Sequence, residues 1–347
     1  IKLFVFHKIP FLLINSLFIL SIFLISCGDS EDVMEENNEL DLLDLSVTVP
    51  NKPASGTTVG KVSIVTTGVT NPVYEIVSQS IDGAMQINST TGDITIADAT
   101  PYEFKVNPVI TAEISVTAGE LQGTAMVTVN VDEITTAQME IIEYFVDVAN
   151  RRANKAARNT VRWEQDMNLF IIGDPGEALL DELNSVVSEI NALITSDVRI
   201  NIVDNIENSN AEIFFGSPQG FIDHYVTTTI ANSIPLEDLQ RSYGLHVSGS
   251  ELESGFVFTF IYVDTENTTD LEKNHLMREQ VARALGLAGP STLYTESIFF
   301  ENILSDYNEF SDLDKELIRL LYSPRMNLGL NAVQSAALLK SILGDEN

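Results

Sequence analysis

The first 27 residues constrain this chain most, because a run of apolar residues there ends at the chain's only cysteine. The run extends from residue 9 to residue 25, Lys2 and Lys8 precede it, and residues 1–26 contain no acid. It is shorter than the roughly 20 residues that a membrane-spanning helix needs, although a plain membrane anchor is the alternative. A basic start followed by such a run is typical of a secretion signal. We therefore predict that residues 1–26 are a signal peptide and that the remaining chain lies outside the cytoplasm.

The segment Leu24-Ile25-Ser26-Cys27-Gly28 resembles the lipobox of bacterial lipoproteins. The resemblance implies cleavage before Cys27, lipidation of its thiol and attachment to a membrane through this N-terminal lipid. Two or three acyl chains, at about 0.8 kcal/mol per buried methylene, give stable anchoring. A single cysteine also excludes an intramolecular disulfide and a thiolate zinc cluster.

Residues 27–40 are rich in acids and poor in apolar side chains, which predicts a disordered tether. An acidic run directly after the cysteine resembles the surface-export signal of Bacteroidetes lipoproteins. This implies an outer-membrane lipoprotein on the cell surface; a periplasm-facing lipoprotein with a merely solvated spacer is the alternative. The whole chain has 50 acidic and 19 basic residues and a net charge of −31. That charge repels phosphates, so we expect no nucleic-acid partner.

Residues 41–134 read as short β runs separated by turn signals, which favours an all-β sandwich. The runs contain Val47 and Val49, then residues 56–62, 73–76, 85–88, 91–96, 110–116 and 125–131.

The segments "GTTVGKV", "PVYEI", "MQINSTTGDITI", "ISVTA" and "AMVTVNVDE" fall in an order that resembles a cadherin-like repeat of the Ig-like class. Such repeats bind calcium through carboxylates at their junctions. Glu103 and Asp132 match two of those acids, but Pro101 and Gly119 stand where others are expected, and Asn51 or Lys52 replaces an early one. We therefore expect a spacer domain, with calcium-dependent adhesion as an alternative.

Residues 136–347 show the pattern of an α/β (α+β) domain with a mixed sheet. Helices are expected at 139–157, 177–194, 271–287, 312–322 and 331–343, and strands at 168–172, 198–203, 211–216 and 255–263, with a long loop before the last strand. Thr269 and Glu272 form a capping-box pattern, and Gly289-Pro290 is expected to end the helix. Trp163 is expected to be a core anchor that packs the first helix onto the sheet.

This order, followed by a Ser-Ile-Phe segment, resembles the core of zincin metallopeptidases, and "ARALGLAGPSTLYTESIFF" (282–300) resembles the end of their active-site helix. The segments "VRWEQDMNLFIIG", "EQVARALGL", "ESIFFEN" and "RLLYSPRMNLGL" are still more similar to an uncharacterised family of zincin-like secreted domains, over residues 140–345. The resemblance implies a helix that carries two histidines at i and i+4, with a glutamate base between them.

The residues at these positions imply a degenerate active-site helix. Glu279 stands at the first histidine, Gln280 at the base, Arg283 at the second histidine and Gly289 at the third ligand. Arginine is cationic and donates only, so it repels a metal ion, and glutamine cannot take a proton from water. Glu279 and Arg283 have the spacing and order of a favourable helical ion pair.

His275 leaves a second interpretation open, because His275 and Glu279 are spaced to ligate a metal together. Only His224 or His246 could complete such a site. We therefore expect no catalytic residues and no cofactor, and a non-catalytic surface protein that binds an extended peptide or a surface protein. A divergent metal-dependent peptidase using zinc at His275 and Glu279 is the first alternative, and the calcium-binding adhesion protein is the second.

Overall fold

The computed structural model describes residues 39–152, 154–225, 234–251, 255–301 and 307–346. The chain divides into two units, residues 1–39 and residues 40–347. The expected signal peptide, Cys27 and nearly all of the acidic tether lie outside the described residues. Within the described residues, no helix combines the length and apolar character needed to cross a bilayer.

The N-terminal β-rich region is built from two facing sheets and a short additional pair. A four-stranded sheet has the order β2-β9-β8-β5 and a three-stranded sheet has the order β3-β7-β6, while β1 pairs with β4. The strands are β1 Leu42–Leu43, β2 Leu45–Val49, β3 Thr58–Gly60, β4 Ser63–Ile64, β5 Val73–Gln79, β6 Met85–Ile87, β7 Ile94–Ile96, β8 Val109–Ala118 and β9 Leu121–Val131. Each expected β run therefore contains or overlaps a strand.

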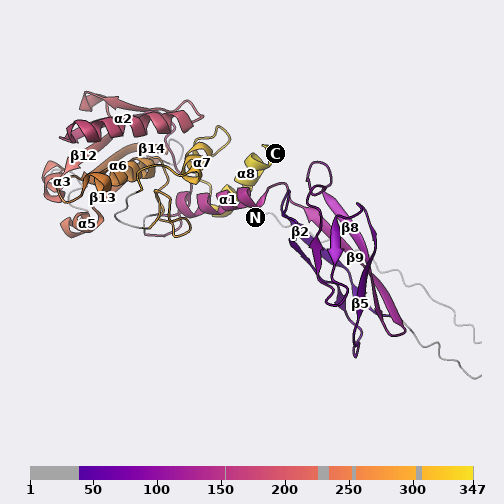
Figure 1. The fold of residues 1–347 in the computed structure, drawn as a ribbon. Helices are drawn as coiled ribbons and strands as arrows, with labels where there is room; N and C mark the ends of the chain where they lie inside the picture. Colours follow the sequence, from indigo (N-terminus) through magenta and orange to yellow (C-terminus); the bar gives the residue numbers. More distant parts are fainter. Residues whose placement is uncertain (1–38, 153, 226–233, 252–254, 302–306, 347) are drawn as a thin grey trace, which may run out of the picture. The chain divides into compact units, whose positions relative to one another are not determined.

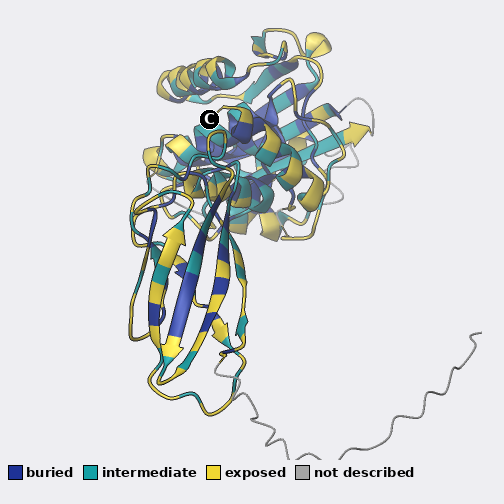
Figure 2. Ribbon diagram, turned by 90° about the vertical axis from the view of Figure 1, so that its right-hand side faces the viewer, coloured by how far each residue is buried: buried dark blue, intermediate teal, exposed yellow. Residues whose placement is uncertain are grey.

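Burial along these strands follows the two-residue period of a β-strand. In β9, buried and exposed side chains alternate almost without interruption, and Figure 2 shows this as alternating colours along the strands. The inward side chains form a core of their own that includes Tyr74, Ile94, Ile114 and Val127. Gly92 shows why the turn before β7 needs glycine, because its φ is +76° and an added Cβ would lie 2.7 Å from the Tyr74 ring.

The second region contains a five-stranded mixed sheet with the order β11-β10-β12-β14-β13. Strands β10, β11, β12 and β14 run parallel, and β13 is antiparallel at the edge beside β14. Their bounds are β10 Met167–Gly173, β11 Ile200–Val203, β12 Ala211–Gly216, β13 Gly244–Glu251 and β14 Gly255–Asp264. A mixed sheet was expected, and it is confirmed.

Helices cover both faces of this sheet because alternate side chains of its strands are apolar on both sides. On one face, Phe215 and Ile261 join the main core with α2 (Gly176–Leu193), α6 (Asp270–Ala284) and α1 (Thr136–Ala149). On the other face, Phe214 and Tyr262 pack with residues of α3 (Pro218–His224) and α5 (Leu236–Ser242). Figure 1 shows α2 and α6 side by side against the sheet, and α7 (Asp312–Leu321) and α8 (Ala332–Asp345) follow them in the chain.

The first helix is shorter than expected. Helix α1 begins after the Thr135–Gln138 capping box and ends at Ala149, not at residue 157. The Asn150 amide donates to the carbonyls of Arg158 and Leu330, which turns the chain away from the helix. The following residues form a tight antiparallel bridge between Arg151 and Ala157 instead of a further helical turn.

The expected loop between residues 217 and 254 was wrong. Its described residues contain α3, α5 and the whole edge strand β13. The missed signals are a Ser217 N-cap followed by Pro218, and the two-residue alternation around Leu245 and Val247.

The long helix α6 also ends earlier than expected. It stops at Ala284, five residues before Gly289. Gly286 has a φ of +122°, and an added Cβ there would lie 2.1 Å from the carbonyl oxygen of Val161. The chain therefore leaves the helix at the first glycine after it, because only glycine adopts this conformation at so close an approach.

Candidate functional site

Helix α6 carries the candidate site and lies against β14 and the edge strand β13. Its start is fixed by the predicted capping box, in which Thr269 and Glu272 each accept from the other's backbone N–H. Two buried aromatic side chains hold its other end: Trp163 Nε1 donates to the Ala284 carbonyl at 3.0 Å, and the Tyr322 hydroxyl donates to the Leu285 carbonyl at 3.0 Å. These bonds satisfy carbonyls that a helix end leaves unpaired. Trp163 is a buried core residue, as predicted, but its hydrogen bond is to the end of α6 and its ring packs against Phe256 of β14, whereas it was expected to pack the first helix onto the sheet.

Glu279 and Arg283 form the ion pair that their spacing predicts. Arg283 Nη2 lies 2.7 Å from Glu279 Oε1, and the two side chains are 12% and 7% exposed. Gln280 Nε2 donates to the other oxygen of Glu279 at 2.9 Å. Glu279 thus has a partner for each oxygen, whereas Arg283 Nε is buried without a hydrogen-bond partner.

His246 on β13 also belongs to this arrangement. The sequence suggested His246 only as a possible metal ligand and did not predict this contact. Its Nδ1 donates to Gln280 Oε1 at 3.4 Å. Burial, and secondarily the charge of Arg283, lower the pKa of His246 to about 3, so the ring is neutral near pH 7. We call Glu279, Gln280, Arg283 and His246 the Glu279 cluster. Arg283 and Gln280 contact the Glu279 carboxylate directly, and His246 contacts Gln280.

The Glu279 cluster partly lines a cavity of about 320 Å³. Its other charged lining residues carry both signs, with the cations Lys155 and Arg241 and the acids Asp238 and Glu301. Lys155 and Glu301 form an ion pair with each other. These charges compensate one another, so the cavity lacks the excess of carboxylate or imidazole lone pairs that a divalent metal requires.

Gly289, at the position of the third ligand, lies against the backbone of α1. A Cβ at Gly289 would be 2.6 Å from the Asp147 carbonyl oxygen and 2.8 Å from that of Val148. The Gly289 N–H donates to the Val148 carbonyl at 2.8 Å, which fixes this approach. A histidine therefore does not fit here without displacing α1. Together with the Arg283 guanidinium, this means that the residues present do not fit a zincin-type zinc ion.

Hydrogen bonds to Asp314 hold the Ser-Ile-Phe segment that follows α6. The sequence showed no sign of this role for Asp314. Asp314 is fully buried. Its carboxylate accepts from the Ser297 hydroxyl at 2.6 Å, from the Ile298 N–H at 3.0 Å and from the Tyr144 hydroxyl at 3.0 Å. The Tyr144 hydroxyl also contacts that of Ser297. No local pattern reveals this cluster, because its members come from three separate segments.

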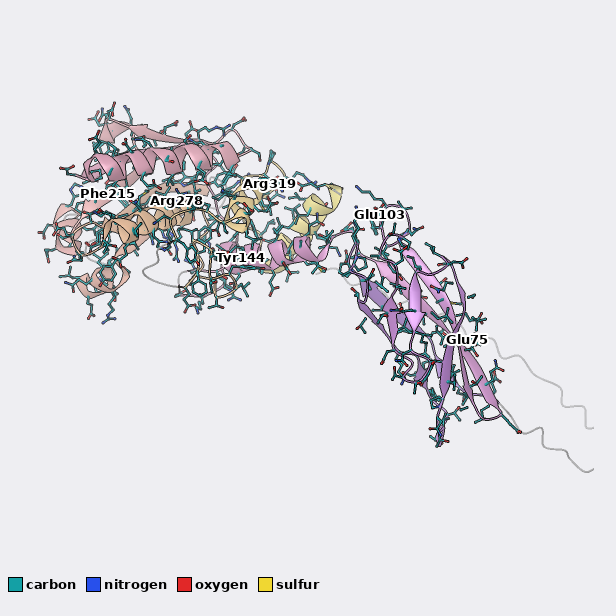
Figure 3. The ribbon with its side chains drawn as sticks, viewed as in Figure 1. Glu75, Glu103, Tyr144, Phe215, Arg278 and Arg319 are labelled. Carbon is teal, nitrogen blue, oxygen red and sulfur yellow. The ribbon has the colours of Figure 1, made fainter. Side chains whose placement is uncertain are left out.

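Arg278, one residue before Glu279, lies on a different side of α6 and joins it to α2. Its guanidinium lies 2.9 Å from Glu182 and 2.5 Å from Glu189, and it also stacks over the Phe310 ring. Figure 3 labels Arg278 between these helices. Ion pairs therefore hold α6 against α2 as well as linking Glu279 and Arg283 along the helix.

His275 lies apart from the other histidines. It is buried, its Nδ1 donates to the Tyr307 carbonyl at 2.6 Å, and its Nε2 has no hydrogen-bond partner. His246 is in the Glu279 cluster, and His224 packs on the Phe214 ring of the other sheet face. In the part of the chain that the structure describes, no three His, Cys, Asp or Glu side chains are grouped as metal ligands.

The cadherin-type acids are paired with lysines. Glu103 lies 3.4 Å from Lys52, and Asp132 lies 2.8 Å from Lys340. Asn51, at an early acid position, accepts the Phe104 N–H through its amide oxygen. Glu103 and Asp132, the two acids that match the cadherin pattern, therefore cannot bind a cation without breaking an ion pair.

Comparisons with known proteins give one family match and several structural ones. A family model described as "Protein of unknown function (DUF2927)" matches residues 138–341. No curated protein matches this chain.

Solved structures of cadherin extracellular domains are among those similar to this chain. The Protocadherin Gamma B2 domains 3–6 are 19% identical, with a TM-score of 0.23, over 26% of this chain and 22% of that one. Drosophila N-cadherin EC1-3 is 13% identical, with a TM-score of 0.24, over 28% and 34%. Human Protocadherin-24 EC1-2 is 13% identical, with a TM-score of 0.23, over 36% and 48%. This chain spans less than half of each, and the similarity concerns a small part of it.

The matched segment of the family model includes β10–β14, the whole of α6 and the Glu279 cluster, and it makes up more than half of the chain. The chain therefore belongs to the DUF2927 family of proteins of unknown function.

Proposed function

We propose that this chain is a membrane-anchored lipoprotein outside the cytoplasm whose α/β region is a non-catalytic, zincin-like binding module. The Glu279–Arg283 ion pair is the observation that carries the proposal. It occupies the two positions at which a zincin-type helix would present histidines, and Gln280 occupies the position of the base. A guanidinium in contact with the carboxylate supplies no lone pair to a metal.

The mixed sheet supports the zincin-like assignment. The elements β10, α2, β11, β12, β14 and α6 follow one another in the expected order, with α3, α5, the edge strand β13 and a short 3₁₀ turn inserted between them. The antiparallel edge strand β13 lies next to α6 and contributes His246 to the Glu279 cluster. An enzyme that lost its metal can retain this scaffold, because the contacts at both ends of α6 involve no ligand position.

The proposed binding mode is addition of an extended peptide to β13. This strand pairs with β14 on one side only, so among the described residues its other edge belongs to no sheet ladder. Unpaired backbone groups of an edge strand give affinity for an added strand. The lipid anchor at Cys27 would hold the module at the membrane; we propose the outer membrane, with its surface as the location.

Elemental analysis of the purified full-length protein tests the proposal directly. We expect far less than one zinc per chain, and the same melting temperature with and without a chelator, because the Glu279–Arg283 pair braces the helix without a metal. Stoichiometric zinc, or chelator-sensitive cleavage of peptides that is lost in His275→Ala, would instead establish the metallopeptidase alternative. Mass spectrometry of the N-terminal fragment tests the lipid on Cys27 independently.

A further inference from the structure

Arg158 is a half-buried cation that pairs with no carboxylate in the described part of the chain. In a chain with 50 acidic and 19 basic residues, most arginines form ion pairs, but the described residues include no carboxylate paired with Arg158. Its Nη2 atom is buried and has no hydrogen-bond partner. Burial, followed by the neighbouring charge of Arg152, lowers the pKa of Arg158 to about 10. A guanidinium desolvated without a partner is unfavourable, and no side chain among the described residues neutralises this charge. The paired arginines are Arg151, Arg162, Arg241, Arg278, Arg283, Arg319 and Arg325.

Arg158 lines a cavity of about 680 Å³ that is separate from the one beside Glu279. Arg152 adds a second cation to its wall, Ser248 and Ser250 add hydroxyls, and Phe256 adds an apolar surface. Glu251 at its edge is exposed and forms no ion pair with either arginine. The wall therefore combines two cations with neutral hydrogen-bonding groups, which suits an oxyanion.

The cavity runs along the edge strand. His246, Val247, Ser248, Ser250 and Glu251 all belong to β13, and all of them line it. A chain added to β13 would thus pass the cavity, and a carboxylate carried by that chain would come within reach of Arg158. Planar guanidinium groups bind carboxylates through two parallel hydrogen bonds, which gives both affinity and orientation.

We propose that the Arg158 cavity is a carboxylate-binding site, and that it receives the terminal or side-chain carboxylate of a peptide extended along β13. The part of this proposal that concerns the peptide rests on the proposed function; the carboxylate site itself does not.

A two-arm experiment on the purified full-length protein separates the two claims. In the first arm, arginine side chains are labelled with ¹⁵N and acetate is added at constant ionic strength. The Arg158 signal, assigned by its loss in Arg158→Met, is expected to shift and saturate. The Arg325→Met variant is the matched control, because Arg325 pairs with Asp345 and does not line the cavity. Absence of a saturable Arg158 shift overturns the carboxylate site.

In the second arm, an acetylated Val-Thr-Val-Thr peptide is compared as the free acid and as the carboxamide. For the wild type and for Arg325→Met, we expect the acid to bind about tenfold more tightly than the carboxamide. For Arg158→Met, we expect the acid and the carboxamide to bind equally. Saturable acetate binding without binding of either peptide keeps the carboxylate site but refutes strand addition. Equal binding of acid and amide to the wild type overturns the peptide carboxylate as the ligand.

The melting temperature of Arg158→Met distinguishes a binding role from a structural one. The variant replaces an unneutralised charge with an apolar side chain of similar length. Its melting temperature is therefore expected to equal or exceed that of the wild type. A fall of more than about 5 °C, a shift that corresponds to a substantial loss of stability, would make Arg158 a structural brace and overturn the proposal.

Discussion

Separate and joint removal of Glu279 and Arg283 tests whether the ion pair braces α6. The variants are Glu279→Leu, Arg283→Met and the double substitution. Loss of one partner of a buried pair typically costs about 3–5 kcal/mol, because the remaining charge is uncompensated. Glu279→Leu leaves a guanidinium that is 12% exposed and whose Nε already lacks a partner. We therefore expect it to cost about 3 kcal/mol, and Arg283→Met about 2 kcal/mol, since Glu279 keeps the Gln280 amide.

The double variant buries two apolar side chains in place of two charges, which is often neutral for stability, so we expect a loss of at most about 1 kcal/mol. The double-mutant cycle then gives a coupling energy of about 4 kcal/mol. The chain contains a matched control in the exposed i, i+4 pair of Glu237 and Arg241, at 3.3 Å and with side chains about 70% exposed. Exposed helical pairs couple by about 0.5 kcal/mol.

Urea unfolding followed by tryptophan fluorescence is the appropriate assay. Trp163 is the only tryptophan of the chain, is fully buried and donates to the carbonyl at the end of α6. Its emission therefore reports on the region that contains the pair and not on the β-sandwich. Urea is preferred to guanidinium because it does not screen charges. A coupling energy no larger than that of Glu237 and Arg241 would refute the idea of an ionic brace.

Three further predictions use the same assay. The pKa of His246 is lowered to about 3 in the folded protein, so below about pH 6.5 the unfolded chain binds a proton at His246 that the folded protein does not. The free energy of unfolding should therefore fall by about 2 kcal/mol between pH 7.5 and pH 5. The His246→Asn variant should lack this part of the fall, and identical pH profiles of the two proteins would contradict the prediction. Gly289→Ala should cost about 1–3 kcal/mol of stability, because its Cβ would meet two carbonyl oxygens of α1. Gly344→Ala is the control and should be nearly neutral, because its Cβ would meet only the flexible Glu133 side chain. Equal effects of the two substitutions would refute the close packing of Gly289 on α1. Asp314→Ala should cost at least about 3 kcal/mol, since it leaves several buried donors unpaired, and a loss below 1 kcal/mol would show that those donors find other partners.

The sequence predicted those elements whose signal is local and periodic. The helix α2 repeats apolar residues at helical spacing and β12 is an apolar strand interrupted only by Glu212, and both lie where the pattern placed them. The capping box at Thr269 and the pairing of Glu279 with Arg283 were also predictable, because each depends on a fixed spacing along one helix.

The missed features depend on contacts between distant segments. The edge strand β13 bears polar and apolar side chains and is defined by its ladder to β14, so the weak alternation in its sequence was not distinguished from a loop. The early end of α6 comes from the Val161 carbonyl, which leaves no room for a side chain at Gly286. His246 reaches Gln280 only because β13 passes α6, at a separation of 34 residues in the sequence.

The supports of α6 explain how the fold can persist without the ligands that its pattern implies. Trp163 and Tyr322 bind the carbonyls at its end, Arg278 ties its other side to α2, and Asp314 fixes the segment that follows. None of these four contacts involves Glu279, Gln280 or Arg283, so the contacts can persist when those three residues change, although loss of one partner of the ion pair lowers stability. Gly289 differs, because the α1 backbone occupies the space that a third ligand would need. Substitutions on α6 alone are therefore insufficient to create a three-ligand site, and recovery of metal binding would require α1 to move as well.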